Sequence, residues 1–514
     1  SPGLMEKYFK DYAEKRLSIP FEQFLALGRR DSSDWSEPFN MAYLAMRGSG
    51  AVNGVSKLHG QVSRKIFEPL FPRWPEAEVP VSHVTNGVHV PTWDSAVSDS
   101  VWERCCGKER WRGAMEAVED DLRSSNDEDL WQLRAESRRL LVEYVRKLHA
   151  RQVAARGAPA EEIQRAAQIL DANTLTIGFA RRFAAYKRPT LLLHDPQRLL
   201  RLLTNRERPV QLVLAGKAHP RDGMGQDMIQ QWVRFVQQPE ARPHVVFLSD
   251  YDVLMAAELV QGVDVWLNTP RRPWEASGTS GMKVLVNGGL HISELDGWWA
   301  EAYSPDVGWA IGDGKEHGDD PAWDAYEADT LYALLEDEVA PAFYERDERG
   351  IAHGWVKRMR ESMAHLTPVF STNRVVRDYT EGYYVPGAAA FQKRVENKGA
   401  LGAELLEWQR ELARHWASAR FGPATLHAGE KEYEFQVQVL LGDLDAKAVR
   451  VELYAEGQNG GAPERHIMER GERLLGVVNG YLYSVRVPTS RPAADYSPRL
   501  VPFHPAALVP LEAP

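Results

Sequence analysis

Apolar and polar residues recur with different periods along the chain, and the changes of period divide it into segments. Residues 1–80 carry apolar side chains three or four positions apart, which predicts helices. Residues 79–93 are rich in β-branched residues and contain an Asn-Gly turn, which predicts a short β segment. Residues 100–165 and 322–420 are charged and have a helical pattern. Helices are therefore expected on both sides of a central segment of different character.

In that central segment, apolar runs of strand length alternate with apolar-periodic helices. The runs occupy residues 175–180, 210–216, 244–250 and 263–268. Buried strands that alternate with helices are typical of a parallel, doubly wound α/β sheet, in which ligands bind beyond the carboxyl ends of the strands. The polar motifs described below each follow one of these strands, so we expect the functional site at that edge.

The last part of the chain has a strict strand alternation. Residues 421–514 contain three such runs, at 433–444, 447–457 and 481–488. They predict a small antiparallel β domain that resembles a β-sandwich. Residues 418–430 have the composition of a linker that precedes it.

Composition excludes several classes of function. The chain has a net charge of −10, from 62 basic and 72 acidic residues, which argues against a general role in binding nucleic acid or a membrane surface. No apolar run approaches ~18 residues, so no transmembrane helix is predicted. The only two cysteines, Cys105 and Cys106, are adjacent, which favours a reducing, cytoplasmic location. No Cys/His cluster has metal-ligand spacing, and no metal is expected.

Four basic side chains follow the first central strand. They are Arg181, Arg182, Lys187 and Arg188. At the end of a strand such a group can converge on an anion, helped by the N-terminus of a following helix. The alternative is that these side chains form a solvated basic surface. The residue types alone do not decide between an anion-binding site and such a surface.

The most informative stretch is EASGTSGMK, residues 275–283. Gly278 and Gly281 permit a backbone that another atom approaches closely, with N–H groups exposed toward an anion. Lys283 can form a Schiff base with an aldehyde if its amine is desolvated. A phosphate-binding turn beside such a lysine suits pyridoxal phosphate, whose phosphate and aldehyde must be anchored together. The alternative is a glycine-rich turn that carries an ordinary lysine.

Taken together, these segments resemble the α-glucan phosphorylases, the family of glycogen, starch and maltodextrin phosphorylases. The resemblance covers residues 40–390. It rests on six long motifs: AVNGVSKLHGQV, TNGVHVPTW, RRFAAYKRP, AGKAHP, EASGTSGMKVLVNGG and DGWWAEAY. The sequence RPAADYSPRLVPFHP near the C-terminus makes the pattern similar to a bacterial branch that ends in an extra domain.

The resemblance implies a two-Rossmann (GT-B) glycosyltransferase with its active site in a cleft. Residues 1–85 would be a helical remnant of the N-terminal Rossmann domain, residues 86–415 the C-terminal Rossmann-like domain with the cofactor site, and residues 421–514 the extra β domain. The implied reaction is phosphorolysis of an α-1,4-glucan by inorganic phosphate to glucose 1-phosphate, with anomeric retention. The glucan and phosphate are the implied partners, and a homo-oligomer is compatible with the resemblance.

The resemblance also implies roles for single residues. Lys283 would hold pyridoxal 5′-phosphate as a Schiff base, and the cofactor phosphate would exchange a proton with the substrate phosphate. Two phosphates side by side repel strongly, so cations must surround them. By position in the motifs, Arg182 and Lys187 match the catalytic residues that hold substrate phosphate; Arg181, Tyr251, Thr279 and Ser280 match those around the cofactor phosphate; Asn86, Ala276, Ser277, Gly278 and the catalytic Glu275 match those that bind glucose hydroxyls.

The chain departs from the family pattern in three places. The better-known branch has a lysine in place of Arg181 and a basic residue in place of Asp252. An acid there would oppose a phosphate unless it points away or pairs with Arg182 or Lys187. Nothing in residues 1–40 matches the glycine loop and histidine with which the family's N-terminal domain contacts substrate. We therefore expect the 514-residue chain alone to be inactive or nearly so.

Two other functions stay open. A cofactor-free glycosyltransferase of the same fold, such as a nucleotide-sugar glucan synthase, also uses a basic pair and a carboxylate, and the lysine of GTSGMK argues against it. The second is a non-catalytic glucan-binding fragment built on the β domain. The 16 tryptophans are compatible with it, because sugar rings bind to aromatic faces.

Overall fold

The computed structural model describes residues 2–113, 115–458 and 461–513. Ser1 and Pro514, the end points of the first and last expected domains, lie outside the described residues. The chain forms two compact units. One consists of Ser1–Val52, Ser63–Val81 and Glu381–Pro514, and the other of Asn53–Val62 and Ser82–Thr380. The expected domain boundaries at residues 85, 415 and 421 stay a prediction.

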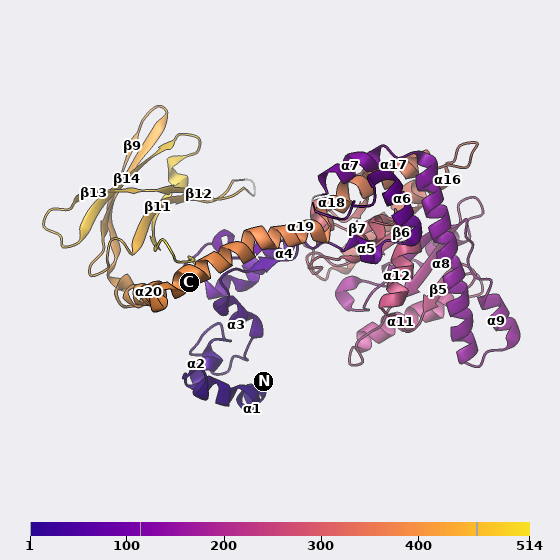
Figure 1. Ribbon diagram of the computed structural model, residues 1–514, viewed down its shortest axis with the longest axis horizontal. Coiled ribbons are helices and arrows are strands. Elements are labelled where there is room, and N and C mark those ends of the chain that lie inside the picture. The colour runs from indigo at the N-terminus through magenta and orange to yellow at the C-terminus, as the bar shows by residue number, and fades with distance from the viewer. Residues whose placement is uncertain (1, 114, 459–460, 514) are drawn as a thin grey trace. The chain divides into compact units, whose positions relative to one another are not determined.

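A six-stranded parallel sheet forms the centre of the second unit (Figure 1). Its strands are β3 (Leu175–Ala180), β4 (Val210–Ala215), β5 (Val245–Leu248), β6 (Val265–Asn268), β7 (Leu290–Glu294) and β8 (Gly308–Ile311). Their order across the sheet is β5-β4-β3-β6-β7-β8, and all neighbours are parallel. The order reverses between β3 and β6, which is the switch point at which open α/β sheets bind ligands. The predicted parallel, doubly wound sheet is confirmed.

The helices of this unit and two short strands surround the sheet. They are α5 (Val90–Trp93), α6 (Ala96–Cys106), α7 (Glu116–Arg123), α8 (Asp127–Ala155), α9 (Ala160–Ala166), α10 (Pro196–Leu203), α11 (Gly223–Val236), α12 (Val253–Gly262), α13 (Ser280–Leu285), α14 (Trp299–Ala302), α15 (Pro321–Ala333), α16 (Ala340–Tyr344), α17 (His353–Glu361), α18 (Thr367–Val369), α19 (Thr372–Tyr379), β1 (Asn53–Gly54) and β2 (Ser82–His83). Helix α4 (Lys57–Phe67) belongs to both units.

Helices cover both faces of the sheet, which explains why its strands are continuous apolar runs. On one face, α8 and α12 pack against Val213 and Val246. On the other, α11 packs against Leu212 and Leu214. With both faces buried, few polar side chains of the strands reach solvent, and the polar residues gather at the strand ends.

The β segment predicted for residues 79–93 is largely wrong. Only the two residues of β2 pair with a strand, and the chain then runs irregularly into α5. Gly87 passes so close to a distant segment that a Cβ there would lie 2.5 Å from the Ser371 carbonyl oxygen. Val88 exchanges backbone hydrogen bonds with residues 370–372. Backbone polar groups of this stretch are therefore satisfied in part by residues 54–55 and in part by residues 370–372, and no continuous strand forms.

The first unit combines helices with two antiparallel sheets. Its elements are α1 (Pro2–Lys15), α2 (Phe21–Ala26), α3 (Met41–Gly48), α20 (Val385–His415), β9 (Arg420–Ala428), β10 (Glu432–Leu440), β11 (Val449–Ala455), β12 (Glu464–Ile467), β13 (Glu469–Arg473), β14 (Gly480–Pro488) and β15 (Ser497–Pro502). The sheet orders are β13-β14-β10-β9 and β12-β11-β15. The predicted antiparallel sheets are confirmed, but residues 418–430 contain the edge strand β9 in place of the expected linker.

Residues far apart in the sequence close the core of this unit. Leu405 and Trp408 of α20 pack against Val437 and Val451 of the two sheets. Within the described part of the chain, none of the helices has the length and apolar character that a membrane span requires.

Candidate functional site

Side chains from both strands at the switch point meet directly. Arg181, the first residue after β3, donates to the Asn268 side chain at the end of β6. Its Nη2 also lies 2.5 Å from Oε2 of Glu275. The Nζ atom of Lys187 lies 3.1 Å from the same oxygen. Two cations therefore share one carboxylate at the carboxyl edge of the sheet, where the sequence places the site.

This cluster is largely removed from water. The side chains of Arg181, Lys187 and Glu275 are only 10–11% exposed. Burial raises the pKa of the Glu275 carboxyl, but Arg181 and Lys187 outweigh burial and leave the pKa below its ordinary value. Glu275 is thus ionised at neutral pH and neutralises one of the two cations. The remaining positive charge favours an anion at this edge.

The four basic side chains predicted near the first strand do not all converge. Arg182 is exposed, and no hydrogen bond or ion pair reaches its guanidinium from the described residues. Arg181 and Lys187 meet Glu275, whereas Arg188 turns away. The expected anion site therefore has three members at most, and including Arg188 in it is wrong.

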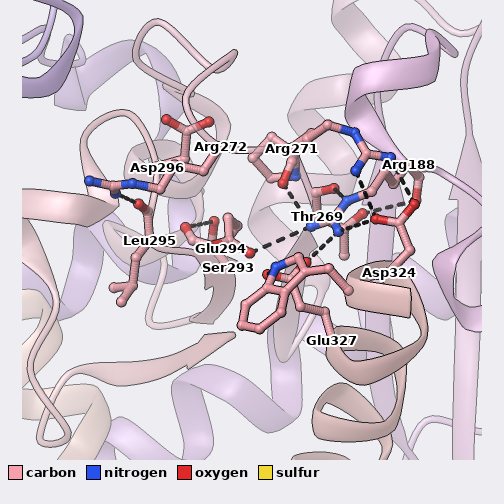
Figure 2. A network of polar contacts seen from close by, with 12 residues as sticks. Arg188, Thr269, Arg271, Arg272, Ser293, Glu294, Leu295, Asp296, Asp324 and Glu327 are labelled. Carbon is pink, nitrogen blue, oxygen red and sulfur yellow. Dashed lines mark hydrogen bonds and ion pairs between the residues drawn. The ribbon is translucent and has the colours of Figure 1, made fainter. Parts of the chain in front are cut away.

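Arg188 belongs to a separate buried network, which Figure 2 shows. Its backbone is in the left-handed region, with φ +42°. The guanidinium pairs with Glu327, lies 2.9 Å from Asp324 Oδ1, and lies 3.5 Å from Glu294 Oε2. Burial and the neighbouring Glu327 raise the pKa of Glu294 to about 10, so Glu294 is protonated at neutral pH. Arg188 thus ties the end of β7 to α15 and has a structural role.

Lys283 lies in the short helix α13 and faces an aromatic ring. Its Nζ is 3.6 Å from the ring centroid of Trp93. The Asn287 side chain donates to the carbonyl oxygens of both Lys283 and Trp93, at 2.9 Å each, and so joins α13 to α5. No carboxylate of the described residues pairs with the amine, and burial lowers its pKa. A desolvated, unpaired amine is more often neutral, which is the form that reacts with an aldehyde.

The turn before Lys283 is closely packed. Gly278 has φ +84°, and a Cβ there would lie 3.3 Å from Cγ of Glu275. A Cβ on Gly281 would lie 2.9 Å from the rings of His291 and Trp298. The small residues are therefore required by the fold as well as by any ligand.

Several polar groups of the same turn are free to bind a ligand. The hydroxyl of Ser277 is buried, and no described group hydrogen-bonds to it. Thr279 stands at the start of α13 without a side-chain cap bond, and the first N–H groups of a helix lack partners within it. The Ser280 hydroxyl accepts a hydrogen bond from Trp266 Nε1 at 3.0 Å and keeps its own proton to donate.

Two of the remaining predicted residues are held by one segment. The backbone N–H of Asn86 donates to the Val55 carbonyl oxygen at 3.0 Å, and the Ala276 carbonyl accepts from Ser56 Oγ at 2.7 Å. Residues of the short segment 53–62 thus position both Asn86 and the start of the glycine-rich turn. No hydrogen bond joins the Asn86 side chain to another of the described residues.

Tyr251 precedes α12 and is half-buried. Burial raises the pKa of its phenol, Arg181 opposes that shift, and Asp252 adds to it. The carboxylate of Asp252 accepts a hydrogen bond from the Met255 N–H at 2.8 Å and caps α12. The acid that departs from the family pattern is therefore committed to a helix start, and no ion pair joins it to Arg182 or Lys187.

Comparisons with known proteins agree with the motifs. A profile of the family described as carbohydrate phosphorylase matches residues 30–305. The chain belongs to this family. It is 42% identical over 398 residues to a glycogen phosphorylase of Mycobacterium tuberculosis, covering 77% of this chain and 46% of that protein. It is 35% identical over 518 residues to a maltodextrin phosphorylase of Thermococcus litoralis, covering 98% of this chain and 60% of that protein. It is 40% identical over 367 residues to a glycogen phosphorylase of Aquifex aeolicus, covering 71% and 52%.

The chain spans about half the length of the curated relatives it matches. The expected membership of the phosphorylase family is confirmed. The roles expected for single residues stay predictions. The geometry shows which of these residues lie close together. Arg181, Lys187 and Glu275 form one cluster, and Gly278 and Thr279 lie in the turn that leads into α13, which carries Ser280 and Lys283.

The site residues fit the cofactor that membership of the phosphorylase family suggests. Pyridoxal phosphate needs an amine for its aldehyde and hydrogen-bond donors for its phosphate. Lys283 supplies an unpaired amine with a lowered pKa, and the turn before it supplies an orphaned buried hydroxyl, at Ser277, and uncommitted donors. Among the described residues, no group of His, Cys, Asp and Glu side chains is arranged to hold a metal ion.

Three residues that shape the candidate site were not predicted from the sequence. Trp93 contacts the Lys283 amine, Asn287 bonds to the carbonyl oxygens of Lys283 and Trp93, and the Asn268 side chain accepts a hydrogen bond from Arg181. Only the fold brings them together, although Trp93 ends one of the family motifs and Asn287 lies in another.

A fourth missed residue, Asp296, supports Glu275. Its carboxylate accepts from the backbone N–H groups of Glu275 and Gly297, at 2.8 Å each. Burial raises the pKa of Asp296 to about 7, against the lowering effect of these two bonds. A detectable signal existed, because an aspartate next to two tryptophans in an apolar stretch is costly to bury unless it is hydrogen-bonded.

Proposed function

We propose that this chain carries one wall of an α-1,4-glucan phosphorylase site, within a GT-B architecture. The proposed reaction is phosphorolysis of the non-reducing ends of glycogen or maltodextrin to glucose 1-phosphate, with retention at the anomeric carbon. The observation that supports it most is Lys283, whose amine is desolvated and unpaired within the described residues. Lys283 follows a glycine-rich turn at the carboxyl edge of the sheet. The same edge of the sheet carries Arg181, Lys187 and Glu275.

In this proposal, Lys283 holds the aldehyde of pyridoxal phosphate. Arg181, Tyr251, Thr279 and Ser280 surround the cofactor phosphate. When bound, the cofactor would supply a phosphate group able to donate a proton to the substrate phosphate and take it back. The residues of the chain hold the two anions together, because fixed cations in a dry site stabilise charge far better than water does.

Arg182 and Lys187 are proposed to hold the substrate phosphate. The free, exposed guanidinium of Arg182 supports this role, because it has no internal partner to give up. Lys187 is different, since its amine is already paired with Glu275. A bound phosphate would therefore share Lys187 with the carboxylate.

Glu275 is proposed to accept hydrogen bonds from glucose hydroxyls. Its carboxylate is ionised and fixed by two cations, so it is an acceptor of constant orientation. Asn86, Ala276, Ser277 and Gly278 complete the sugar contacts in this proposal. The cytoplasmic location and the homo-oligomer expected from the sequence stay predictions.

A product assay separates this function from the nucleotide-sugar alternative. The chain, at high concentration, is incubated with maltoheptaose and inorganic phosphate, with and without pyridoxal phosphate. We expect glucose 1-phosphate only with the cofactor, and at a rate far below that of the relatives, since the chain alone is predicted to be nearly inactive. Lys187→Ala should abolish the product, whereas Lys217→Ala, at the end of a different strand, should not. Cofactor-independent extension of glucan from a nucleotide sugar would contradict the proposal.

A further inference from the structure

The second unit contains a large cavity outside the site described above. Its volume is about 760 Å³. It opens along β5, the edge strand of the sheet, and Figure 1 shows this strand among α8, α9 and α11. Thr174, Gln211 and His244 line it, and they precede or begin strands β3, β4 and β5. The cavity therefore reaches the amino ends of these three strands. Ser249, which follows the carboxyl end of β5, also lines it, but neither Arg181 nor Glu275 does.

One wall of the cavity is apolar and belongs to α11. Ile229, Val233 and Val236 are four and three residues apart, so they form one stripe of the helix, and all three are half-buried. Leu170 and Phe247 contribute apolar surface from the sheet side. A volume of this size with mostly apolar walls is typical of a small-molecule pocket, for which about 300–1,000 Å³ is usual.

Three arginines supply the charge of the cavity. Arg156, Arg165 and Arg242 line it, and none of them forms an ion pair with a carboxylate of the described residues. Arg156 donates to the Ser249 hydroxyl at 3.0 Å, and Arg242 donates to the Gln237 carbonyl oxygen at 3.3 Å. Each guanidinium has five N–H donors, so most of the donors stay available.

The other titratable groups leave a positive balance. Two carboxylates line the cavity, Glu162 and Asp171, and Asp171 already accepts from the backbone of Asn173 at 2.6 Å. Burial lowers the pKa of both His149 and His244; Arg156 lowers the pKa of His149 further, and Glu162 opposes that. Both histidines are therefore neutral at neutral pH, and three cations face two anions.

We propose that this cavity binds an organic anion with an apolar body. The apolar body lies against the stripe of α11, and a carboxylate, sulfonate or phosphate group lies among Arg156, Arg165 and Arg242. Guanidinium groups bind such anions with two parallel hydrogen bonds, which specifies an anionic head group and not merely a hydrophobic one. The site is independent of the proposed phosphorolysis, because it shares no residue with the switch point.

The probe for a test is 8-anilinonaphthalene-1-sulfonate, an aromatic sulfonate whose fluorescence rises in apolar surroundings. We expect saturable binding to the full 514-residue chain. Val233→Trp should remove it, because indole fills the space beside the α11 stripe. Arg165→Glu should weaken it about tenfold, the effect of losing one charge-assisted hydrogen bond. Arg234→Glu is the matched control, since Arg234 is an exposed residue of α11 outside the cavity. The affinity of this variant for the probe should stay within about twofold of that of the parent chain.

Circular dichroism melting shows whether each variant folds. If Val233→Trp does not fold, Arg165→Glu and Arg242→Glu decide the question, because neither arginine is paired with a carboxylate that the fold depends on. Absence of saturable binding by the parent chain overturns the proposal. So does an unchanged affinity in folded Val233→Trp and Arg165→Glu, or a loss of affinity in Arg234→Glu as large as that in Arg165→Glu.

Discussion

Among single residues, Glu275 is the one whose carboxylate joins Arg181 and Lys187 at the switch point. Glu275→Gln leaves two buried cations without a counter-charge and should lower the free energy of unfolding by about 3 kcal/mol. Arg181 and Lys187 hold the pKa of Glu275 below its ordinary 4.5, so the carboxylate stabilises the fold above that pH and loses its effect as the pH falls further. Urea unfolding of the parent chain and of Glu275→Gln between about pH 7 and pH 3 measures the difference in their free energies of unfolding. A stability gap that does not narrow in acid would contradict the account.

Asp296 has the opposite pH dependence. Burial raises its pKa from 3.8 to about 7, so the folded state binds this proton more tightly than the unfolded chain does. Its contribution to stability is full below pH 3.8 and is lost as the pH rises to 7. Asp296→Asn keeps an oxygen for the Glu275 N–H and removes the titration, so thermal unfolding should depend less on pH in this window. An unchanged slope would show that the Asp296 carboxyl does not titrate there.

At the scale of elements, the turn before α13 depends on glycine. Gly278→Ala places a Cβ at φ +84° and 3.3 Å from Glu275 Cγ, which should cost about 1 kcal/mol and displace Glu275. Gly223→Ala, at the first residue of α11, is the control, because a Cβ there has no neighbour within 4 Å. Denaturant midpoints of the two variants are compared. Equal stability of the two would argue against a strained backbone at Gly278.

Asp252 caps helix α12, and two substitutions test whether this is its role or whether its charge also affects phosphate binding. Asp252→Ala should lower stability by about 1 kcal/mol, and Asp252→Asn should not, because asparagine also caps helices. Since the carboxylate is bonded to the Met255 N–H, neither change should alter the affinity for inorganic phosphate, which isothermal titration measures. A clear rise in phosphate affinity in both variants would show that the acid opposes the anion after all.

The elements that could be predicted are those whose pattern is set locally. Strands β3 to β6 are continuous apolar runs with helices between them, so both their positions and their parallel orientation follow from the sequence. Strand β9 was missed because its residues are almost all exposed and show no alternation, so its pairing with β10 alone makes it a strand. The prediction for residues 79–93 is wrong because the backbone partners of this segment are divided between residues 54–55 and residues 370–372, which the local pattern does not reveal.

At the scale of the whole molecule, the site is assembled from residues that are far apart in the sequence. Motif position predicts that Lys187 and Glu275 belong to the site, and the strand order explains their contact across the switch point. Trp93 contacts Lys283 through the packing of α5 on α13. Arg188 pairs with Asp324 and Glu327 of α15 and not with the carboxylate that its basic neighbours share. Sequence patterns identify which residue types are available, and long-range packing decides which of them meet.

The proposed function requires that the Lys283 amine bind the aldehyde of pyridoxal phosphate. The most direct measurement incubates the 514-residue chain with the cofactor, reduces it with borohydride, and maps the pyridoxyl label by peptide mass spectrometry. The amount of label on Lys283 is compared with the amount on the exposed Lys217 at the same cofactor concentration. Lys283→Arg is the control variant. We predict one dominant label, on Lys283, that disappears in Lys283→Arg and exceeds the label on Lys217 at least about tenfold, because burial lowers the pKa of the Lys283 amine whereas Lys217 is exposed. A label spread over surface lysines, with none on Lys283, would contradict it.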